Sequence, residues 1–386
     1  GAISINIGKG IDKKEKIGLI NNNEIFYYKK SLNSKLNKKD LDLIKKIIMD
    51  IFSKYAKLDD ENTNSGFVIF EKKPSNYFYK KSVQKIMDID KTINFLEKNA
   101  VYHNGFKNRR GLIGATGAVS WQPIKDKTYE LITYREQDKW GTKRLVEDKD
   151  VKKIEKNFPS TFDNYDFLNK HNRLVPNSPC PILYGIRGNN PDLLIKAKSI
   201  IKSEKVDSWI LFESNQGTDD HLKKRSIKAI KPYESSITSG FVCKKPYTIK
   251  GGHVIFSIKD KSGKIDCAAY EPTKNFRDVV RNLMINDEVE VYGGVRNKPL
   301  TINLEKIRIK KLQEKIIKVE NPICPKCKKH MKSIGKDKGF KCRKCGTESK
   351  KPKMKKIKRE IQAGFYEVPI CARRHLSKPL KRINLP

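Results

Sequence analysis

The sequence predicts a multidomain α+β protein built from an N-terminal α+β unit, a ferredoxin-like or similar open sheet, an OB-fold β-barrel and a zinc ribbon. Three patterns support this prediction. A strand–helix–strand order occupies residues 101–235, five strand patterns follow each other over 236–312, and four cysteines stand in two close pairs within 313–350. The N-terminal unit would cover residues 1–100 and a basic tail residues 351–386. A chain of 386 residues has room for several domains of this size.

The N-terminal unit mixes strand and helix patterns. Residues 1–30 alternate apolar and polar side chains as in a β-hairpin, beginning with a strand at 3–7. Apolar residues at helical spacing predict helices over 38–57 and 81–98, with a short strand at 66–70 between them. Because the chain opens on what reads as a strand interior, we expect that a further segment precedes Gly1 and that this unit is partial.

The second unit is predicted from the order of its elements. Strand patterns occupy residues 129–135, 181–188 and 209–212, and a helix is expected from 191 to 203. Strands and a helix in this order are typical of a ferredoxin-like or similar open sheet.

The third unit reads as an OB-fold. Its strands are expected at 240–242, 253–258, 264–270, 287–292 and 300–309, with a helix at 276–284 between the third and the fourth. OB-folds bind single-stranded nucleic acid through a basic face and stacked aromatic rings. The candidates for stacking are Phe241, Phe256, Tyr270 and Tyr292. The alternative is that these rings fill the barrel core.

Two Cys-x-x-Cys pairs predict a metal site. The expected ligands are Cys324, Cys327, Cys342 and Cys345. Zinc takes four thiolates in a tetrahedron, and a complete set leaves no open position for a substrate, so we predict a structural zinc ion. His330 lies between the pairs and is an alternative ligand. The pairs are crowded by the cations Lys326, Lys328, Lys329, Arg343 and Lys344, of which Lys344 is the one we expect to contact RNA.

The charge balance favours a polyanionic partner. Lysine and arginine number 83 against 44 acidic residues, a formal net charge of +39, which is typical of nucleic-acid-binding proteins. Part of the lysine excess could instead reflect an AT-rich genome.

The sequence holds no apolar run near the roughly 18 residues needed to cross a bilayer and no visible signal peptide, so we expect a cytoplasmic protein without a membrane partner.

A segment rich in small residues, 108–119, offers a first candidate ligand site. Arg110, Gly111 and Gly114 could form a turn whose backbone amides approach a phosphate. The alternative is a tightly packed helix of small residues.

A polar cluster after the strand at 209–212 offers a second candidate ligand site. It consists of Asn215, Gln216, Thr218, Asp219 and Asp220. Amides, a hydroxyl and two carboxylates suit a cationic or hydroxylated ligand, and the two aspartates would anchor a cation. The alternative is a helix N-cap made by Thr218 or Asp219.

Taken in order, these motifs resemble those of the archaeal agmatidine synthetases. The matching segments are RGLIGA at 110–115, YGIRG at 184–188, SNQGTD at 214–219, the OB-fold, the four-cysteine ribbon and ARRHLSKPL at 372–380. The resemblance extends from about residue 60 to residue 383.

The resemblance implies an ATP-dependent ligase that modifies tRNA. Its members join agmatine to carbon 2 of the wobble cytidine of isoleucine tRNA with a CAU anticodon, so that AUA is decoded. ATP with its magnesium is the substrate that phosphorylates the oxygen of the base, and the amine then displaces the phosphate. The first domain of the family is kinase-like. Its aspartates would precede Gly1, so the catalytic residues stay unknown, and this chain alone could bind tRNA without catalysing the reaction.

The resemblance also assigns roles to the candidate residues. The cluster at 215–220 would recognise agmatine, and Arg110 with the glycines after it would hold phosphate. The OB-fold, the ribbon and the tail would hold the tRNA, the tail through Arg373, Arg374, His375 and Lys378. A charge run of this kind is usually only a solvated surface.

Two other classes of protein remain open. One is a non-catalytic RNA-binding protein with an OB-fold and a zinc ribbon, and the other is a replication factor that binds single-stranded DNA. Both predict that residues 101–222 bind neither ATP nor agmatine.

Overall fold

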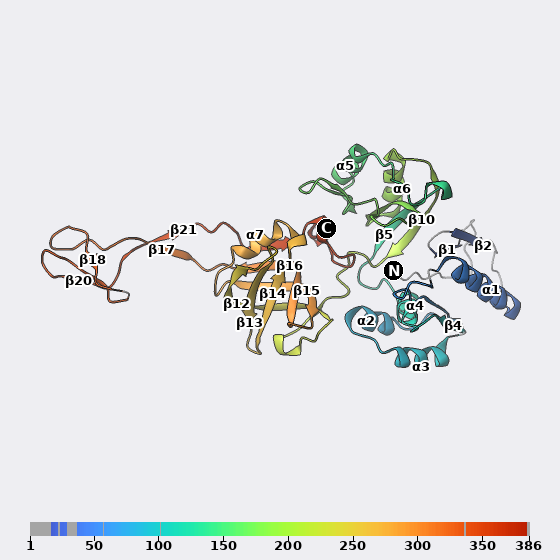
Figure 1. Cartoon of the computed structure of the whole chain (residues 1–386), viewed down its shortest axis with the longest axis horizontal. Coiled ribbons are helices and arrows are strands. Elements are labelled where there is room, and N and C mark those ends of the chain that lie inside the picture. Colours follow the sequence, from blue (N-terminus) through green and yellow to red (C-terminus); the bar gives the residue numbers. More distant parts are fainter. Residues whose placement is uncertain are drawn as a thin grey trace.

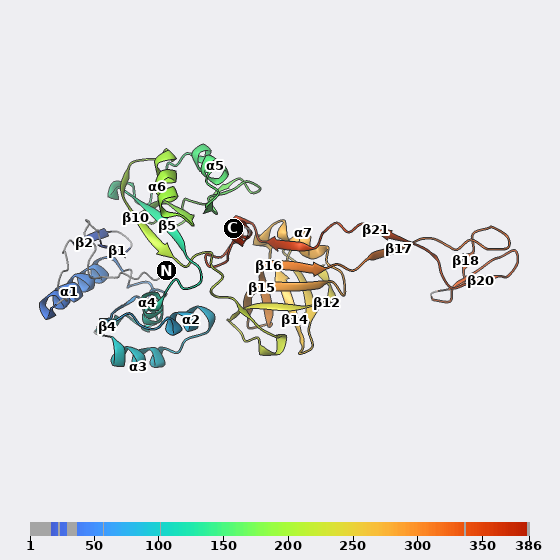
Figure 2. The ribbon, with the colours of Figure 1, turned by 180° about the vertical axis from the view of Figure 1, so that it is seen from behind.

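The computed structural model describes residues 17–21, 24–28, 37–56, 58–100, 102–335 and 337–383. An N-terminal unit and a sheet domain lie side by side at one end of an elongated molecule (Figure 1). A β-barrel follows, and a small ribbon projects from it at the far end of a two-stranded arm, as the reverse view also shows (Figure 2).

Two expectations for the start of the chain fall on residues without a described structure. Gly1, before which we expect the aspartates of the kinase-like domain, and the strand expected at 3–7 both lie outside the described residues.

Within the described residues, the N-terminal unit combines two small antiparallel sheets with four helices. One sheet pairs β1 (Ile17–Asn21) with β2 (Glu24–Tyr28), and the other pairs β3 (Gly66–Ile69) with β4 (Tyr102–Gly105). The helices are α1 (Lys38–Tyr55), α2 (Asn76–Gln84), α3 (Ile89–Asn99) and α4 (Gly111–Ser120).

The single helix expected over 81–98 is wrong. The chain forms α2 and α3 instead, because Asp88 begins a new helix by accepting hydrogen bonds from the amides of Asp90 and Lys91.

The sheet domain has ferredoxin-like topology, as predicted. Its main elements run β5 (Thr128–Arg135), α5 (Asp148–Asn157), β6 (Thr161–Phe162), β9 (Ile182–Gly188), α6 (Pro191–Ile200) and β10 (Val206–Ser214). The strands lie in the order β10–β5–β9–β6, all antiparallel. The core joins the sheet to the helices through Leu131, Leu183, Ile186, Val151 and Leu194. A hairpin of β7 (Tyr165–Asp166) and β8 (His171–Asn172) stands beside it.

The barrel is the predicted OB-fold. It consists of β12 (Ser235–Thr248), β13 (Val254–Lys259), β14 (Lys264–Ala269), α7 (Phe276–Arg281), β15 (Glu288–Arg296) and β16 (Thr301–Lys311). The strand order β12–β13–β14–β16–β15 closes where β15 pairs with β12. Two short strands are added, β11 (Lys223–Lys224) beside β12 and β22 (Gly364–Glu367) beside β16.

The four aromatic candidates of the barrel have different surroundings. Phe256 is fully buried and Tyr292 is 9% exposed, so these two rings belong to the core. Tyr270 packs edge-on against His253. Phe241 is 47% exposed and is therefore free to stack on a base.

An arm links the barrel to the ribbon. The arm pairs β17 (Lys315–Glu320) with β21 (Lys353–Ile357), and the ribbon holds β18 (Lys332–Ser333), β19 (Phe340–Lys341) and β20 (Glu348–Ser349). At the base of the arm the Nη2 of Arg359 lies 2.8 Å from the Oδ2 of the buried Asp287, which fastens the arm to the barrel.

After the arm, the chain returns and ends between the barrel and the sheet domain with α8 (Leu380–Ile383) (Figure 1). Single 3-10 turns occur at Gln137–Lys139, Ile227–Ala229, Glu271–Thr273 and Ile370–Ala372. Among the described residues, no helix has both the length and the apolar character needed to cross a membrane.

Candidate functional site

The polar cluster predicted after β10 forms a loop at the centre of the molecule. We call residues 215–221 the junction loop, because side chains from every other domain except the ribbon reach it. No helix follows β10 in this described part of the chain, so the N-cap interpretation is wrong: residues 216–221 form turns. Gly217 and Asp219 both have positive φ, +65° and +62°, which suits glycine and is tolerated by aspartate.

The N-terminal unit reaches the junction loop through α2. The hydroxyl of Tyr79 donates to the Oδ2 of Asp220 over 2.8 Å and accepts from the Nδ2 of Asn215 over 2.8 Å. Gln84 donates to the carbonyl of Asp220 over 2.9 Å. Burial raises the pKa of Tyr79 and also that of Asp220, so the tyrosine remains a neutral donor to the carboxyl at neutral pH.

The barrel reaches the junction loop through Lys306 on β16. The side chain of Lys306 has no exposed surface, and its Nζ lies 2.6 Å from each carboxylate oxygen of Asp219. The same ammonium donates to the carbonyl of Lys378 over 2.9 Å. Asp219 therefore does anchor a cation, but in this structure the cation belongs to the protein. Burial lowers the pKa of Lys306, and Asp219 opposes that shift.

The sheet domain contacts the loop through β5. Gln216 donates its side-chain Nε2 to Glu130, which also accepts from the Nε of Arg187 over 2.9 Å. The hydroxyl of Thr128 donates to the carbonyl of Gln216 over 2.8 Å. The Oε1 of Gln216 is buried and has no hydrogen-bond partner within the described part of the chain. A buried acceptor left in this way is suited to a donor on a ligand.

The tail runs beside the junction loop and pairs with it. The amides of Gly217 and Asp219 donate to the carbonyls of His375 and Leu376 over 2.7 and 2.8 Å. Arg382 donates to the carbonyl of Gly217 and, over 2.8 Å, to the Oδ1 of Asp126.

The four tail residues expected to contact tRNA have unequal surroundings. Arg373 has a side chain only 6% exposed, paired with Asp163 and, over 2.6 Å, with Glu367. The Nζ of Lys378 donates to Asp126 over 2.9 Å. Arg374 is 60% exposed and pairs with Glu305 of the barrel over 2.9 Å, and His375 is exposed. Arg373 and Lys378 are thus committed to protein carboxylates, whereas Arg374 and His375 face solvent. Burial lowers the pKa of His375, so this side chain offers a neutral imidazole and not a cation.

The segment that starts at Arg110 is the helix α4. Gly111 packs so tightly that a Cβ there would lie 2.2 Å from the carbonyl oxygen of Asn64, and a Cβ at Gly117 would lie 2.7 Å from the Oγ of Ser82 in α2. This agrees with the interpretation as a packed helix of small residues. Arg110 and Gly114 remain exposed at its N-terminal end, where a helix favours an anion.

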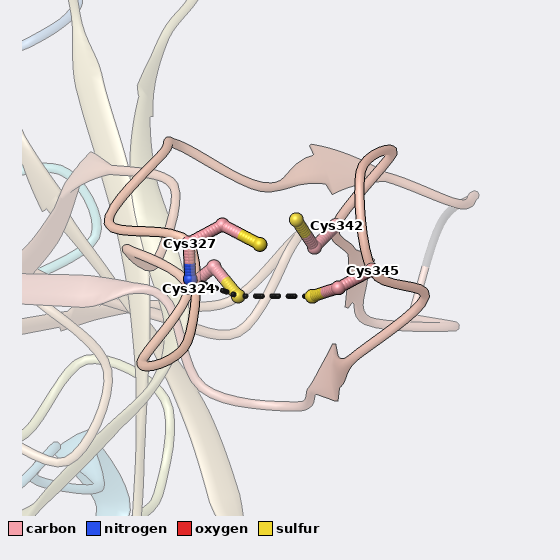
Figure 3. Close-up of side chains that lie close together, drawn as sticks. All are labelled: Cys324, Cys327, Cys342 and Cys345. Atoms are coloured by element: carbon pink, nitrogen blue, oxygen red, sulfur yellow. Dashed lines mark hydrogen bonds between the residues drawn. The ribbon is translucent and has the colours of Figure 1, made fainter.

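The four ribbon cysteines form the predicted metal site. Their sulfurs lie within 4.8 Å of one another and turn toward a common point (Figure 3). The Sγ atoms of Cys324 and Cys345 are 3.4 Å apart, close to the roughly 3.8 Å edge of a tetrahedron with zinc–sulfur bonds of about 2.3 Å. His330 is exposed, with its Nδ1 near the carbonyl of Asn321, and is not part of the cluster. The residues present therefore fit structural zinc.

A basic hollow lies beside the metal site. It is lined by Lys329, His330, Lys332, Cys342, Arg343 and Lys344 and encloses about 340 Å³. Four positive side chains around an open hollow suit the phosphates of a nucleic acid.

Sequence reasoning missed several residues of the junction. They are Tyr79, Asp126, Glu130, Lys306 and Arg382. No local pattern marks them, because each acts through a partner far along the chain.

The chain matches known families over most of its length. Residues 1–108 match the TiaS TCKD domain, 109–221 the TiaS FLD domain, 237–310 the OB-fold nucleic acid binding domain and 321–361 the TiaS C-terminal zinc ribbon domain. The isoleucine tRNA 2-agmatinylcytidine synthetase TiaS of Methanocaldococcus jannaschii is 44% identical over 91% of this chain and 84% of its own. That of Archaeoglobus fulgidus is 42% identical over 88% and 81%.

Solved structures agree with these matches. The complex of TiaS with its isoleucine tRNA and ATP is 40% identical and superposes with a TM-score of 0.80 over 90% of this chain and 82% of the other. The complex of TiaS with the tRNA, AMPCPP and agmatine is 39% identical, with a TM-score of 0.78 over 90% and 83%.

Replacing one zinc ligand should unfold the ribbon alone. The buried core of the ribbon is small and includes the ligands Cys324 and Cys342, so we expect metal to replace the missing apolar burial. Cys327→Ser should reduce bound zinc from about one ion per chain to a small fraction, measured by elemental analysis. Cys371→Ser is the matched control and should keep its zinc, and full zinc content in Cys327→Ser would contradict the assignment.

The ion pairs of Asp126 should make the tail sensitive to acid. Burial alone would raise the pKa of Asp126, but hydrogen bonds from Arg382 and Lys378 outweigh it and hold the pKa below its usual value. This contribution to stability is present above about pH 4, the unfolded value, and is lost as pH falls through the lower folded value. The Tm difference between wild type and Asp126→Asn should therefore shrink from pH 7 toward pH 3. Asp138→Asn, at an exposed surface pair, should show almost no difference at either pH.

Proposed function

This chain belongs to the TiaS family, and we propose that it is an isoleucine tRNA 2-agmatinylcytidine synthetase, an ATP-dependent ligase that joins agmatine to the wobble cytidine. The observation that carries the proposal is the match to relatives of that name over more than four-fifths of their length, through all four domains. Their solved complexes contain the isoleucine tRNA, ATP or AMPCPP, and agmatine.

The reaction consists of activation followed by displacement. The oxygen at carbon 2 of the cytidine bonds to a phosphorus of ATP, a phosphoanhydride bond of ATP breaks, and the remaining part of the nucleotide leaves. The amine nitrogen of agmatine then bonds to carbon 2, the carbon–oxygen bond breaks, and the oxygen leaves with its phosphate while the amine loses a proton. For this displacement the protein must hold the amine of agmatine against the base. It must also bind the guanidinium of agmatine at a place away from the reacting carbon.

The junction loop supplies groups that recognise a cation. The unpartnered buried Oε1 of Gln216 accepts a hydrogen bond from agmatine, and Asn215 and Thr218 line the same turn. Asp220 accepts a hydrogen bond from the neutral hydroxyl of Tyr79, and its carboxyl oxygens can accept further hydrogen bonds from agmatine. The charge of Asp219 is neutralised by Lys306, so that carboxylate acts by holding the loop.

The exposed N-terminal end of α4 suits the phosphates of ATP or of the activated base. Arg110 contributes its guanidinium there, and the exposed Gly114 adds no side chain, whereas Gly111 is packed against the backbone of Asn64. Because α4 packs against α2, this end belongs to the same part of the molecule as Tyr79. Magnesium arrives with ATP as part of the substrate.

The tRNA is held by the barrel, the ribbon and the exposed side chains of the tail. Lys344 and Arg343 in the ribbon hollow contact phosphates, as do Arg374 and His375. Phe241 offers a ring for stacking. Contact through Arg373 or Lys378 would require these side chains to leave Asp163 and Asp126.

A net charge of +39 steers the polyanion to the protein, and we place the protein in the cytoplasm with its tRNA.

Zinc has a structural role in this scheme. Four thiolates complete its coordination, so it folds the ribbon and leaves the chemistry to other groups.

Incorporation of labelled agmatine into tRNA tests the activity and the loop together. The wild type should transfer label to isoleucine tRNA with a CAU anticodon only when ATP is present. Gln216→Ala should raise the KM for agmatine about tenfold, the loss expected for one hydrogen bond to a charged group. Gln137→Ala, on an exposed turn of the same domain, is the control and should leave KM unchanged. Tight tRNA binding without any transfer by the wild type would favour a non-catalytic RNA-binding protein.

Removing the ribbon cations should weaken tRNA binding in a way that depends on salt. The double variant Arg343→Ala/Lys344→Ala should reduce the slope of log affinity against log salt by about one to two. The control Lys139→Ala/Lys149→Ala removes two exposed cations of the sheet domain. An equal loss of affinity in both double variants would show that net charge, and not the hollow, holds the tRNA.

A further inference from the structure

We propose that Lys306, in the barrel, is a positioning residue for the amine substrate, which it influences through Asp219 and the junction loop. The inference rests on the proposed function and adds a residue from outside the sheet domain that carries the loop. It also gives a physical link between the barrel that holds the tRNA and the pocket that holds agmatine.

The complete burial of Lys306 is explained by its contacts with the junction loop and the tail. A lysine with no exposed surface is rare unless it is paired, because the ammonium loses its hydration. Farther along β16, beyond its pairing with β22, Lys310 and Lys311 are exposed. The Nζ of Lys306 instead donates to Asp219 and to the carbonyl of Lys378, both outside the barrel.

Asp219 links the contact with Lys306 to the conformation of the junction loop. Its residue is held at a φ of +62°, its amide donates to the carbonyl of Leu376, and its Oδ1 accepts from the amide of Lys378 over 2.7 Å. The carboxylate thus joins the barrel lysine to the tail while its own backbone is in an unfavourable region. Without the ammonium, the amide of Lys378 is the one of these contacts that would still bind the carboxylate, which is only 20% exposed.

The position of Asp219 also determines the positions of the ligand-binding side chains of the junction loop. The hydroxyl of Thr218 donates back to the carbonyl of Asn215 over 2.7 Å, which closes the turn. Gln216 and Asn215 therefore move with residues 218 and 219. A shift of about 1 Å at a positioning group is enough to reduce binding or rate strongly.

The next residue of the barrel holds the other end of the loop. Glu305 accepts from the Nε2 of His221 over 3.0 Å and pairs with Arg374. Two consecutive residues of β16 therefore hold two nearby residues of the junction loop, so the loop is placed by the barrel as well as by its own sheet.

The test compares Lys306→Met with Lys310→Met, a matched change on the same strand at a partly exposed lysine that contacts Ser239 and Glu290. Lys306→Met should raise the KM for agmatine about tenfold, with kcat per folded molecule and tRNA affinity within about twofold of wild type. Lys310→Met should leave all three unchanged. A merely structural role would lower the folded fraction without changing KM, so an unchanged KM overturns the proposal.

A second variant avoids a buried unpaired charge. Lys306→Met/Asp219→Asn removes both partners and should fold even if the single variant does not. Its KM should be no worse than that of either single change, since the two residues act as one unit. Independent effects that simply add would contradict the proposal.

Hydrogen exchange separates this proposal from the proposed function. The amides of Gly217 and Asp219 should lose protection in Lys306→Met and keep it in Lys310→Met, whether or not the protein modifies tRNA. Unchanged protection in Lys306→Met overturns the positioning role. If the wild type transfers no agmatine while the protection changes as expected, the proposed function fails and the link between barrel and loop stands.

Discussion

The ion pair between Lys306 and Asp219 is the buried contact that holds the junction loop against the barrel. Its ammonium is fully buried and its carboxylate only 20% exposed, so removing one partner alone would cost about 3–5 kcal/mol. The pair joins the barrel to the loop that ends the ferredoxin-like sheet, and the tail and α2 contact that loop beside it. The junction loop therefore takes this conformation only when the domains are correctly assembled.

The positive charge of the chain serves two separate purposes. Arg373, Lys378 and Arg382 are paired with carboxylates between domains and build the protein. Arg374 also pairs with a carboxylate, that of Glu305, but its side chain stays 60% exposed, and like the cations of the ribbon hollow it suits a polyanion. A basic segment is therefore a poor guide to an RNA-binding surface until the carboxylates nearby are known, because pairing neutralises the charge and desolvation removes the access.

The ribbon needs a metal ion for its stability because its apolar core is small. With a core that includes two of its own metal ligands, it buries too little apolar surface to fold by itself. Zinc supplies the cross-link, and the paired strands of the arm carry the ribbon far from the barrel (Figure 1). This placement gives the molecule a long reach, which suits a partner as extended as a tRNA.

The sequence alone determined the features that depend on local spacing. The two Cys-x-x-Cys pairs and the five strands of the barrel were predicted correctly, because periodicity and ligand spacing act over a few residues. In the ferredoxin-like sheet, β5, β9, β10 and the helix α6 were predicted, whereas the helix α5 and the two-residue strand β6 were missed. The break between α2 and α3 was missed, because the Asp88 cap outweighs a continuous apolar pattern. Only the tertiary structure decided which cation meets Asp219 and which tail cations stay exposed. Lys306 and Asp219 are 87 positions apart and Arg382 and Asp126 are 256 apart, and among 83 lysines and arginines no local pattern selects such pairs.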